Sequence, residues 1–198
     1  IQHLQYREGL DNHNCMEWKV STIVDCELNI LPQGELKLEN AVVYLKRPIR
    51  CWGTLRMERS HLIYCMGQPQ DMIVLDRARG CQMRDCRVDG RGEAGGLWAT
   101  GTRIELTDSV FCNMKKGRAV FNALSPQIHG CTFNYCMDGG VFCTGGTICD
   151  CTFVNCRSKR GAGISMNGQN GLIRSCRFVR CMADQRNGAI EKGLGQRV

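Results

Sequence analysis

Two aspartates at equivalent places in a repeated pattern are the first candidates for chemistry. Asp85 and Asp108 each stand directly before a small residue, Cys86 or Ser109, that begins a short apolar pattern. If successive repeats stack as neighbouring strands do, about 4.8 Å apart, the two carboxylates lie about 5 Å from each other. That separation suits a retaining glycosidase, and two like charges so close raise the pKa of one carboxyl. The pair therefore predicts acid–base chemistry on a glycosidic bond.

The same position also favours a purely architectural interpretation. It holds Asp25, Glu39 and Asp150 in other repeats, and an aspartate before a turn hydrogen-bonds the local backbone. A catalytic site interrupts a repeat rather than continuing it. We therefore expect this column of carboxylates to serve the turns.

Basic side chains form two short clusters that predict a binding edge. Both fall in expected turns, two repeats apart: Lys115, Lys116 and Arg118, then Arg157, Lys159 and Arg160. With a net charge of +7, such an edge favours an acidic protein surface or an anionic polymer as partner. Nucleic acid is less favoured because aromatic residues make up only 7% of the chain, and the repeated phenylalanines are expected in the core.

The elements that would position these residues follow from a phrase that occurs three times. CTFNYC (131–136), CTFVNC (151–156) and CRFVRC (176–181) share the pattern Cys-x-Phe-x-x-Cys. Extended towards the N-terminus, the first position of the phrase falls at residues 26, 40, 60, 86, 109, 131, 151 and 176. Apolar residues alternate within each unit, and glycine-rich joints separate the units, which predicts short strands. A repeat of about 22 residues built from strands alone indicates a solenoid.

We therefore predict an all-β fold, a right-handed parallel β-helix of about eight coils of roughly 22 residues. Equivalent residues of successive coils stack into ladders in the core, cysteines in one column (131, 151, 176) and phenylalanines in the next (133, 153, 178). Residues 1–20 are expected to form an N-terminal cap or an irregular segment. Residues 21–198 are expected to form the β-helix, which continues or is capped beyond Val198 because an open coil exposes strand edges.

Fifteen cysteines set the expected redox state. The count is odd, and many cysteines alternate with apolar residues, which is typical of small buried thiols rather than of a disulfide framework. We therefore expect the cytoplasm or another reducing compartment, with the surface of an anaerobe or a virion as the alternative. The Cys149-x-Cys151 and Cys-x4-Cys spacings arise from the repeat itself, so we expect neither a metal site nor a cofactor. No apolar run approaches the roughly 18 residues that cross a membrane.

The phrases quoted above resemble the pectate-lyase-like superfamily of right-handed parallel β-helix repeat proteins, over about residues 20–198. More narrowly, GCTFNYCMDGGVFC (130–143), after SVF (109–111) and CRV (86–88), looks like the cysteine-rich β-helix of the adenovirus large early-region protein and its capsid-interlacing relative. The superfamily resemblance implies a polysaccharide lyase or hydrolase, or a non-catalytic adhesin or scaffold. The adenoviral resemblance implies protein binding.

The enzyme signatures that the superfamily resemblance implies are incomplete. The chain has no Asp-Asp pair and no Gly-His-Gly sequence. A calcium-dependent lyase needs an acidic cluster beside a basic residue, and the nearest candidates are Asp85, Asp89 and Glu93 with Arg87 or Arg91.

We therefore expect a non-catalytic recognition or scaffold module that binds a protein or an anionic polymer. The alternative is a carbohydrate-active enzyme, a lyase or a glycoside hydrolase, that acts on an acidic polysaccharide through Asp85 and Asp108. The sequence leaves oligomerisation open.

Overall fold

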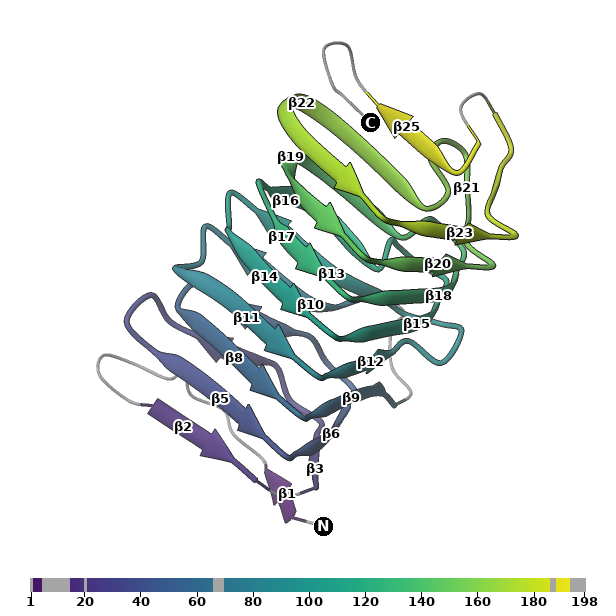
Figure 1. Ribbon diagram of the computed structural model, residues 1–198. Helices are drawn as coiled ribbons and strands as arrows, with labels where there is room; N and C mark the ends of the chain where they lie inside the picture. The colour runs from purple at the N-terminus through teal and green to yellow at the C-terminus, as the bar shows by residue number, and fades with distance from the viewer. Residues whose placement is uncertain (1, 5–14, 20, 66–69, 186–187, 193–198) are drawn as a thin grey trace.

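The computed structural model is a parallel β-helix, and it describes residues 2–4, 15–19, 21–65, 70–185 and 188–192. Its strands stack coil upon coil from the N-terminus to the C-terminus (Figure 1). There are about seven turns of about 23 residues, close to the eight coils of roughly 22 residues expected from the sequence. Every strand pairing is parallel, and the described residues contain no helix.

Each coil passes through three faces in a fixed order, here called face 1, face 2 and face 3. Face 1 is the nine-stranded sheet of β1 (Gln2–Leu4), β3 (Thr22–Val24), β6 (Val42–Leu45), β9 (His61–Tyr64), β12 (Arg87–Asp89), β15 (Val110–Met114), β18 (Thr132–Cys136), β20 (Thr152–Val154) and β23 (Arg177–Val179). Face 2 contains β4 (Leu28–Ile30), β7 (Ile49–Cys51), β10 (Asp71–Asp76), β13 (Gly95–Thr100), β16 (Val120–Leu124) and β25 (Ile190–Lys192). Face 3 contains β2 (Cys15–Trp18), β5 (Glu35–Glu39), β8 (Thr54–Glu58), β11 (Gly80–Arg84), β14 (Ile104–Thr107) and β17 (Gln127–His129).

Two long strands join faces 2 and 3 near the C-terminal end. β19 (Val141–Cys149) and β22 (Ile164–Arg174) begin on face 2 and end on face 3. Their pairing shifts register between Thr144 and Gly146, which is where the chain turns the corner. A short parallel pair, β21 (Arg157–Ser158) with β24 (Met182–Ala183), lies in the turns between faces 1 and 2.

A ladder of stacked phenylalanine rings fills the core behind face 1, as the sequence predicted. Phe111, Phe133, Phe153 and Phe178 pair in register, and their neighbouring ring centroids lie 5.5, 4.8 and 5.0 Å apart. The interplanar angles fall from 16° to 8° along the row. Because a parallel β-helix places identical offsets above one another, one large residue per coil becomes a continuous apolar stack.

Each corner between faces 3 and 1 begins with a residue in the left-handed backbone conformation. Asn40, Asp85 and Asp108 have φ of 50°, and Asp150 has φ of 55°. Asparagine and aspartate tolerate this conformation because their short polar side chains hydrogen-bond locally. The column of aspartates seen in the sequence therefore follows from the shape of the corner.

The second residue of these corners is small, and from Ser60 onward it carries a side-chain hydrogen-bond donor. Ser60 and Ser109 each donate to the carbonyl oxygen two residues earlier at 2.8 Å, and Cys151 does so at 3.1 Å. The two serine hydroxyls also accept a backbone N–H from the preceding coil at 3.1 Å. Serine and cysteine alternate at this position because both are small and both satisfy an otherwise buried carbonyl.

The sequence alignment of the first two repeats was wrong. β6 pairs with β9 so that Val43 faces Leu62, which puts Ala41 rather than Asn40 in the column of Ser60. Cys26 follows β3 and lies outside this column, because Val24 is the partner of Leu45. These coils have neither the cysteine nor the phenylalanine of the phrase. Because Val42 and Val43 are adjacent and both apolar, the alternation of apolar residues does not show which of them faces the core.

Strands already occur in the segment expected to be a cap or irregular. β1 pairs with β3 and β2 pairs with β5, so residues 2–4 and 15–18 continue faces 1 and 3. Residues 1, 5–14 and 20 lie outside the described residues, as do residues 193–198 at the other end. The boundary at residue 21 and the expected continuation past Val198 stay predictions.

Side chains are described for fourteen cysteines; thirteen of them, all but Cys26, are free thiols, and ten of these are buried. Burial raises the pKa of Cys51 and of Cys143 to about 12. Among the described free thiols, Cys65, Cys176 and Cys181 are partly exposed. Because a thiolate is the reactive species, packing protects all the buried thiols, and protonation adds protection to those whose pKa is raised.

We therefore expect brief alkylation of the native protein at neutral pH to modify the partly exposed Cys65, Cys176 and Cys181 well before the ten buried cysteines. Peptide mass spectrometry after a second, mass-shifted alkylation in denaturant would assign each site. Rapid native modification of Cys143 or Cys151 would contradict the laddered core.

Removing a ring from the middle of the phenylalanine ladder should be more harmful than removing one from its end. Phe153 is fully buried between two rings, whereas Phe178 is only partly buried. Phe153→Ala should lower the free energy of unfolding by about 3–5 kcal/mol, measured by urea denaturation, because the cavity has no way to collapse. Phe178→Ala is the matched control, and an equal loss for both variants would show that the stack does not act as a core.

Candidate ligand-binding groove

A row of aromatic side chains points outward from face 2, on a different side from the buried phenylalanine ladder. Trp98, Phe121 and Phe142 occupy the same position in β13, β16 and β19. The Trp98 and Phe121 ring centroids lie 4.7 Å apart, and those of Phe121 and Phe142 lie 5.1 Å apart. Trp98 is 40% exposed, and its Nε1 donates to Thr100 Oγ1 at 2.9 Å. The surface therefore offers solvent-facing rings.

The outward row was missed in the sequence, although a signal was present. GLW (96–98), AVF (119–121) and GVF (140–142) each place an aromatic residue directly after a buried apolar one, at matching points of three repeats. The aromatic content of 7% and the inward phenylalanine ladder do not describe these positions, because adjacent residues of a strand face opposite sides of the sheet.

The aromatic row ends in a groove. In the next coil the position of Phe142 is taken by Ser165, whose hydroxyl donates to Glu191 Oε2 at 3.0 Å. The groove has a volume of about 530 Å³ and contains Phe121, Phe142, Lys159, Arg160 and Asn167 among its lining residues. These residues come from three successive coils, so the groove runs across strands and along the axis of the β-helix.

Arg118 forms part of this groove and is a buried cation that makes no ion pair with any described residue. It is only 8% exposed, which differs from the exposed cation expected from the sequence. Its guanidinium lies against Gly139, where a Cβ would come within 2.7 Å of Nη1. The guanidinium carbon, Cζ, lies 5.6 Å from the centroid of the Phe142 ring. Gly139 has φ of +107° and leaves this space open.

The hydrogen bonds of Arg118 all go to uncharged acceptors. Nη2 donates to Ser158 Oγ and to the Arg160 carbonyl oxygen, both at 3.0 Å, and Nη1 donates to the carbonyls of Val141 and Gly161 at 3.4 Å. Burial lowers the Arg118 pKa, and the more distant Asp138 and Glu191 partly oppose that effect. Only more distant carboxylates therefore compensate the positive charge of Arg118. Its hydrogen bonds connect its own turn to the turn at residues 158–161, two coils further on.

The structure places the other predicted cations around this groove. Lys159 and Arg160 line it, while Lys115, Lys116 and Arg157 are exposed in the neighbouring turns between faces 1 and 2. None of these five makes an ion pair with a described residue. Elsewhere, Lys37, Arg50, Arg56 and Arg59 each pair with a glutamate, whereas exposed arginines such as Arg84 and Arg174 on face 3 make no ion pair with a described residue. The groove is distinguished by cations that lie beside the outward rings, although the carboxylates of Asp138 and Glu191 line it as well.

A half-buried carboxyl adjoins the groove. Asp71 lies at the start of β10, and its side chain packs against Gly95 and Gly117. A Cβ added to Gly95 would lie 2.1 Å from Asp71 Oδ1, and one added to Gly117 would lie 2.8 Å from it. Burial, together with the smaller effect of the nearby Asp138 charge, raises the pKa of Asp71 to about 6. Gly117 immediately precedes Arg118, so this carboxyl and the buried cation belong to one surface.

Comparison with protein families identifies the fold independently. The family described as the right-handed beta helix region matches residues 49–194, well over half of the chain. The chain belongs to this family. The expected superfamily is thereby confirmed, while the narrower adenoviral resemblance stays a prediction. Neither the curated proteins nor the solved structures gave a significant match.

In this right-handed β-helix, the predicted catalytic aspartates lie away from the groove. Asp85 and Asp108 are exposed corner residues between faces 3 and 1, which is the corner opposite face 2. The Asp108 carboxylate projects over Gly130 of the next coil. Both therefore fit the architectural interpretation given by their backbone conformation.

The remaining candidates for a lyase site stabilise a loop on face 1. Asp89 accepts hydrogen bonds from the Arg91 backbone N–H at 2.9 Å, from Asn113 Nδ2 at 3.0 Å and from Arg87 Nη2 at 3.2 Å. Glu93 is exposed in the same loop. Asp89 lies at the opposite end of β12 from Asp85, so the structure does not gather the predicted acidic cluster around one point.

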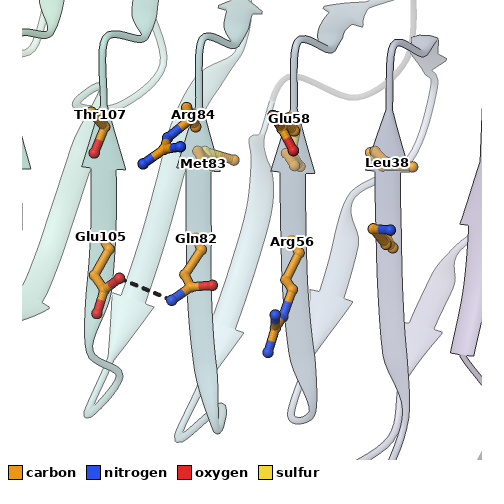
Figure 2. Close-up of a pocket in the computed structure, with 10 residues that line it drawn as sticks. Leu38, Arg56, Glu58, Gln82, Met83, Arg84, Glu105 and Thr107 are labelled. Carbon is orange, nitrogen blue, oxygen red and sulfur yellow. Dashed lines mark hydrogen bonds between the residues drawn. The ribbon is translucent and has the colours of Figure 1, made fainter.

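Face 3 has a smaller hollow, of about 290 Å³, whose charges are largely satisfied within the protein. Figure 2 shows outward side chains of β8, β11 and β14, with Gln82 Nε2 donating to Glu105 Oε2 at 2.9 Å. Arg56 pairs with Glu35 at 2.7 Å. Self-paired charges leave little attraction for a ligand, so this face is a weaker candidate than the groove.

No group of three or more histidine, cysteine, aspartate or glutamate side chains among the described residues is arranged to hold a metal ion. None of the described segments forms a helix of the length and apolarity needed to span a membrane.

The raised pKa of Asp71 gives a pH-dependent stability with a definite sign. Since the folded-state pKa of about 6 lies above the ordinary value of 3.8, ionisation disfavours the folded state, and stability is lost as the pH rises through about 6. Asp71→Asn removes that ionisation. We expect its unfolding midpoint at pH 8 to exceed that of the unmodified protein by about 2–4 °C, with little difference at pH 4.

The control for this measurement is Asp76→Asn, which changes an exposed aspartate on the same strand. It should leave the midpoint nearly unchanged at both pH values. A lower midpoint for Asp71→Asn at pH 8 would show that the ionised carboxylate is held by favourable contacts.

Proposed function

We propose that the protein is a non-catalytic recognition module that binds an anionic polysaccharide along the face 2 groove. The observation that carries this proposal is the meeting of the outward aromatic row with unpaired cations at one place. The rings supply an apolar surface for the C–H faces of sugars. Arg118, Lys159 and Arg160 supply positive charge that no carboxylate of the described residues neutralises at contact distance.

The β-helix gives a reason for a polymer rather than a small anion. Equivalent positions recur at each coil, about 4.8 Å apart along the axis, so a repeating ligand meets similar contacts at each step. The groove also contains Ser165, Asn167 and Gln185, which are neutral hydrogen-bonding side chains suited to hydroxyl groups. A polysaccharide with carboxylate or sulfate groups combines these requirements.

Binding should be measured by calorimetry with a polyuronate, a sulfated polysaccharide, a neutral polysaccharide and a single-stranded polynucleotide. We expect the anionic polysaccharides to bind and the neutral one not to bind. Lys159→Glu/Arg160→Glu should weaken binding at least about tenfold, with weaker binding also at higher salt.

The matched control is Arg84→Glu/Arg174→Glu, which makes the same charge change with two exposed arginines on face 3. It should retain most of the affinity. Equal losses in both double variants would indicate nonspecific attraction by net charge. Binding of the polynucleotide alone, or of none of the polymers, would refute the proposal.

A second candidate function is cleavage of the same class of polymer. It is favoured by Asp71, whose raised pKa would let it donate a proton near neutral pH, with Asp138 as a second carboxylate nearby. In that case the unmodified protein releases reducing ends or unsaturated products from a polyuronate, and Asp71→Asn abolishes release without abolishing binding. Binding without any cleavage would leave the recognition module as the function.

A further inference from the structure

A second hollow lies across the same row of turns, on the face 1 side. Its volume is about 560 Å³, and its wall is mainly apolar, formed by Tyr135, Met137 and Met114. Tyr135 is 47% exposed and Met137 is 42% exposed, so two large apolar side chains, two residues apart in the sequence, face solvent in the hollow. Two exposed cations, Arg91 and Lys115, also line it.

Tyr135 occupies a backbone position that suits asparagine. Its φ is +54°, and the equivalent residues of the neighbouring coils are Asn113, with φ of +57°, and Asn155, with φ of +52°. A bulky aromatic residue is strained in this left-handed conformation, whereas asparagine is tolerated. The Tyr135 side chain makes no ring stacking and no hydrogen bond with the described residues. No such contact therefore offsets the energetic cost of its left-handed backbone conformation.

The surface around Tyr135 is electropositive towards an incoming partner. Asp89 is the only acidic residue among those that line the hollow, and its carboxylate already accepts three hydrogen bonds within the loop. Arg91 and Lys115 make no side-chain ion pair with a described residue, and Lys116 is exposed beside them. The hollow therefore combines an apolar floor with a cationic rim.

We propose that this hollow docks an acidic segment of a partner protein. A large apolar side chain of that segment packs between Tyr135 and Met137, and neighbouring carboxylates face Arg91 and Lys115. A protein suits the hollow better than a glycan because the exposed side chain of Met137 provides an adaptable apolar surface, and glycans have no large apolar side chains. A single tyrosine is also too few rings to hold consecutive nucleobases. This surface is separate from the face 2 groove, so the β-helix would join a protein to a polymer.

The decisive variant is Tyr135→Asn, because it should separate binding from stability. It restores the residue found in the equivalent places of the adjacent coils, so the unfolding midpoint should stay the same or rise. Fluorescence anisotropy with a short labelled peptide that alternates glutamate with leucine and tryptophan should show at least about a tenfold weaker affinity than for the unmodified protein. Lys115→Glu should also weaken binding, and a peptide with lysine in place of glutamate should not bind.

Two matched controls test the location. Leu172→Asn removes a comparably exposed apolar side chain from face 3 and should leave peptide affinity unchanged. Lys159→Glu/Arg160→Glu should also leave it unchanged, which separates this proposal from polysaccharide binding in the groove. The proposal is overturned if the acidic peptide does not bind, if Tyr135→Asn binds it equally well, or if Tyr135→Asn lowers the unfolding midpoint.

Discussion

The structure depends on one constraint at its corners, where the chain must turn without leaving a buried carbonyl unsatisfied. A left-handed residue makes the turn, and a small buried residue then donates a hydrogen bond back to the carbonyl two residues earlier, as Ser60, Ser109 and Cys151 do. Only small residues fit this place, as Ala41 also shows, and serine and cysteine recur because they add the hydrogen-bond donor. With the corner fixed, the next inward position always falls at the same point, and it holds the stacked phenylalanines of the C-terminal coils.

The outward positions follow the same repetition, and they acquire different properties on different faces. On face 3 of the N-terminal coils, neighbouring rows hold opposite charges, as in the contacts of Lys37 with Glu17 and of Arg56 with Glu35. On face 2 the corresponding row is aromatic and stops at Phe142. A regular row presents the same surface at every coil, so a distinct binding site arises where the row changes, here at the step from Phe142 to Ser165.

The turns between faces 1 and 2 hold most of the features that the regular coils do not need. They contain Lys115, Lys116, Lys159 and Arg160, the buried Arg118, and the glycines that make room for Arg118 and Asp71. These turns vary in length from coil to coil, whereas the corners between faces 3 and 1 do not. Because the length of these turns can vary, they can present different side chains to a ligand while the strands stay in register.

The sequence by itself determined the architecture, because a β-helix repeats in space whatever repeats in the chain. The coil length and the ladders were predicted from the repeated positions of Cys131, Cys151, Phe133 and Phe153. The alignment of the repeats failed at Asn40 and Cys26, where the phrase is absent and where the adjacent valines 42 and 43 could each face either side of a strand. Only the tertiary structure decided the site. Residues such as Phe142, Arg118 and Lys159 meet because coils stack at about 4.8 Å, and whether a side chain such as Arg118 is exposed or buried depends on turns from two coils further on.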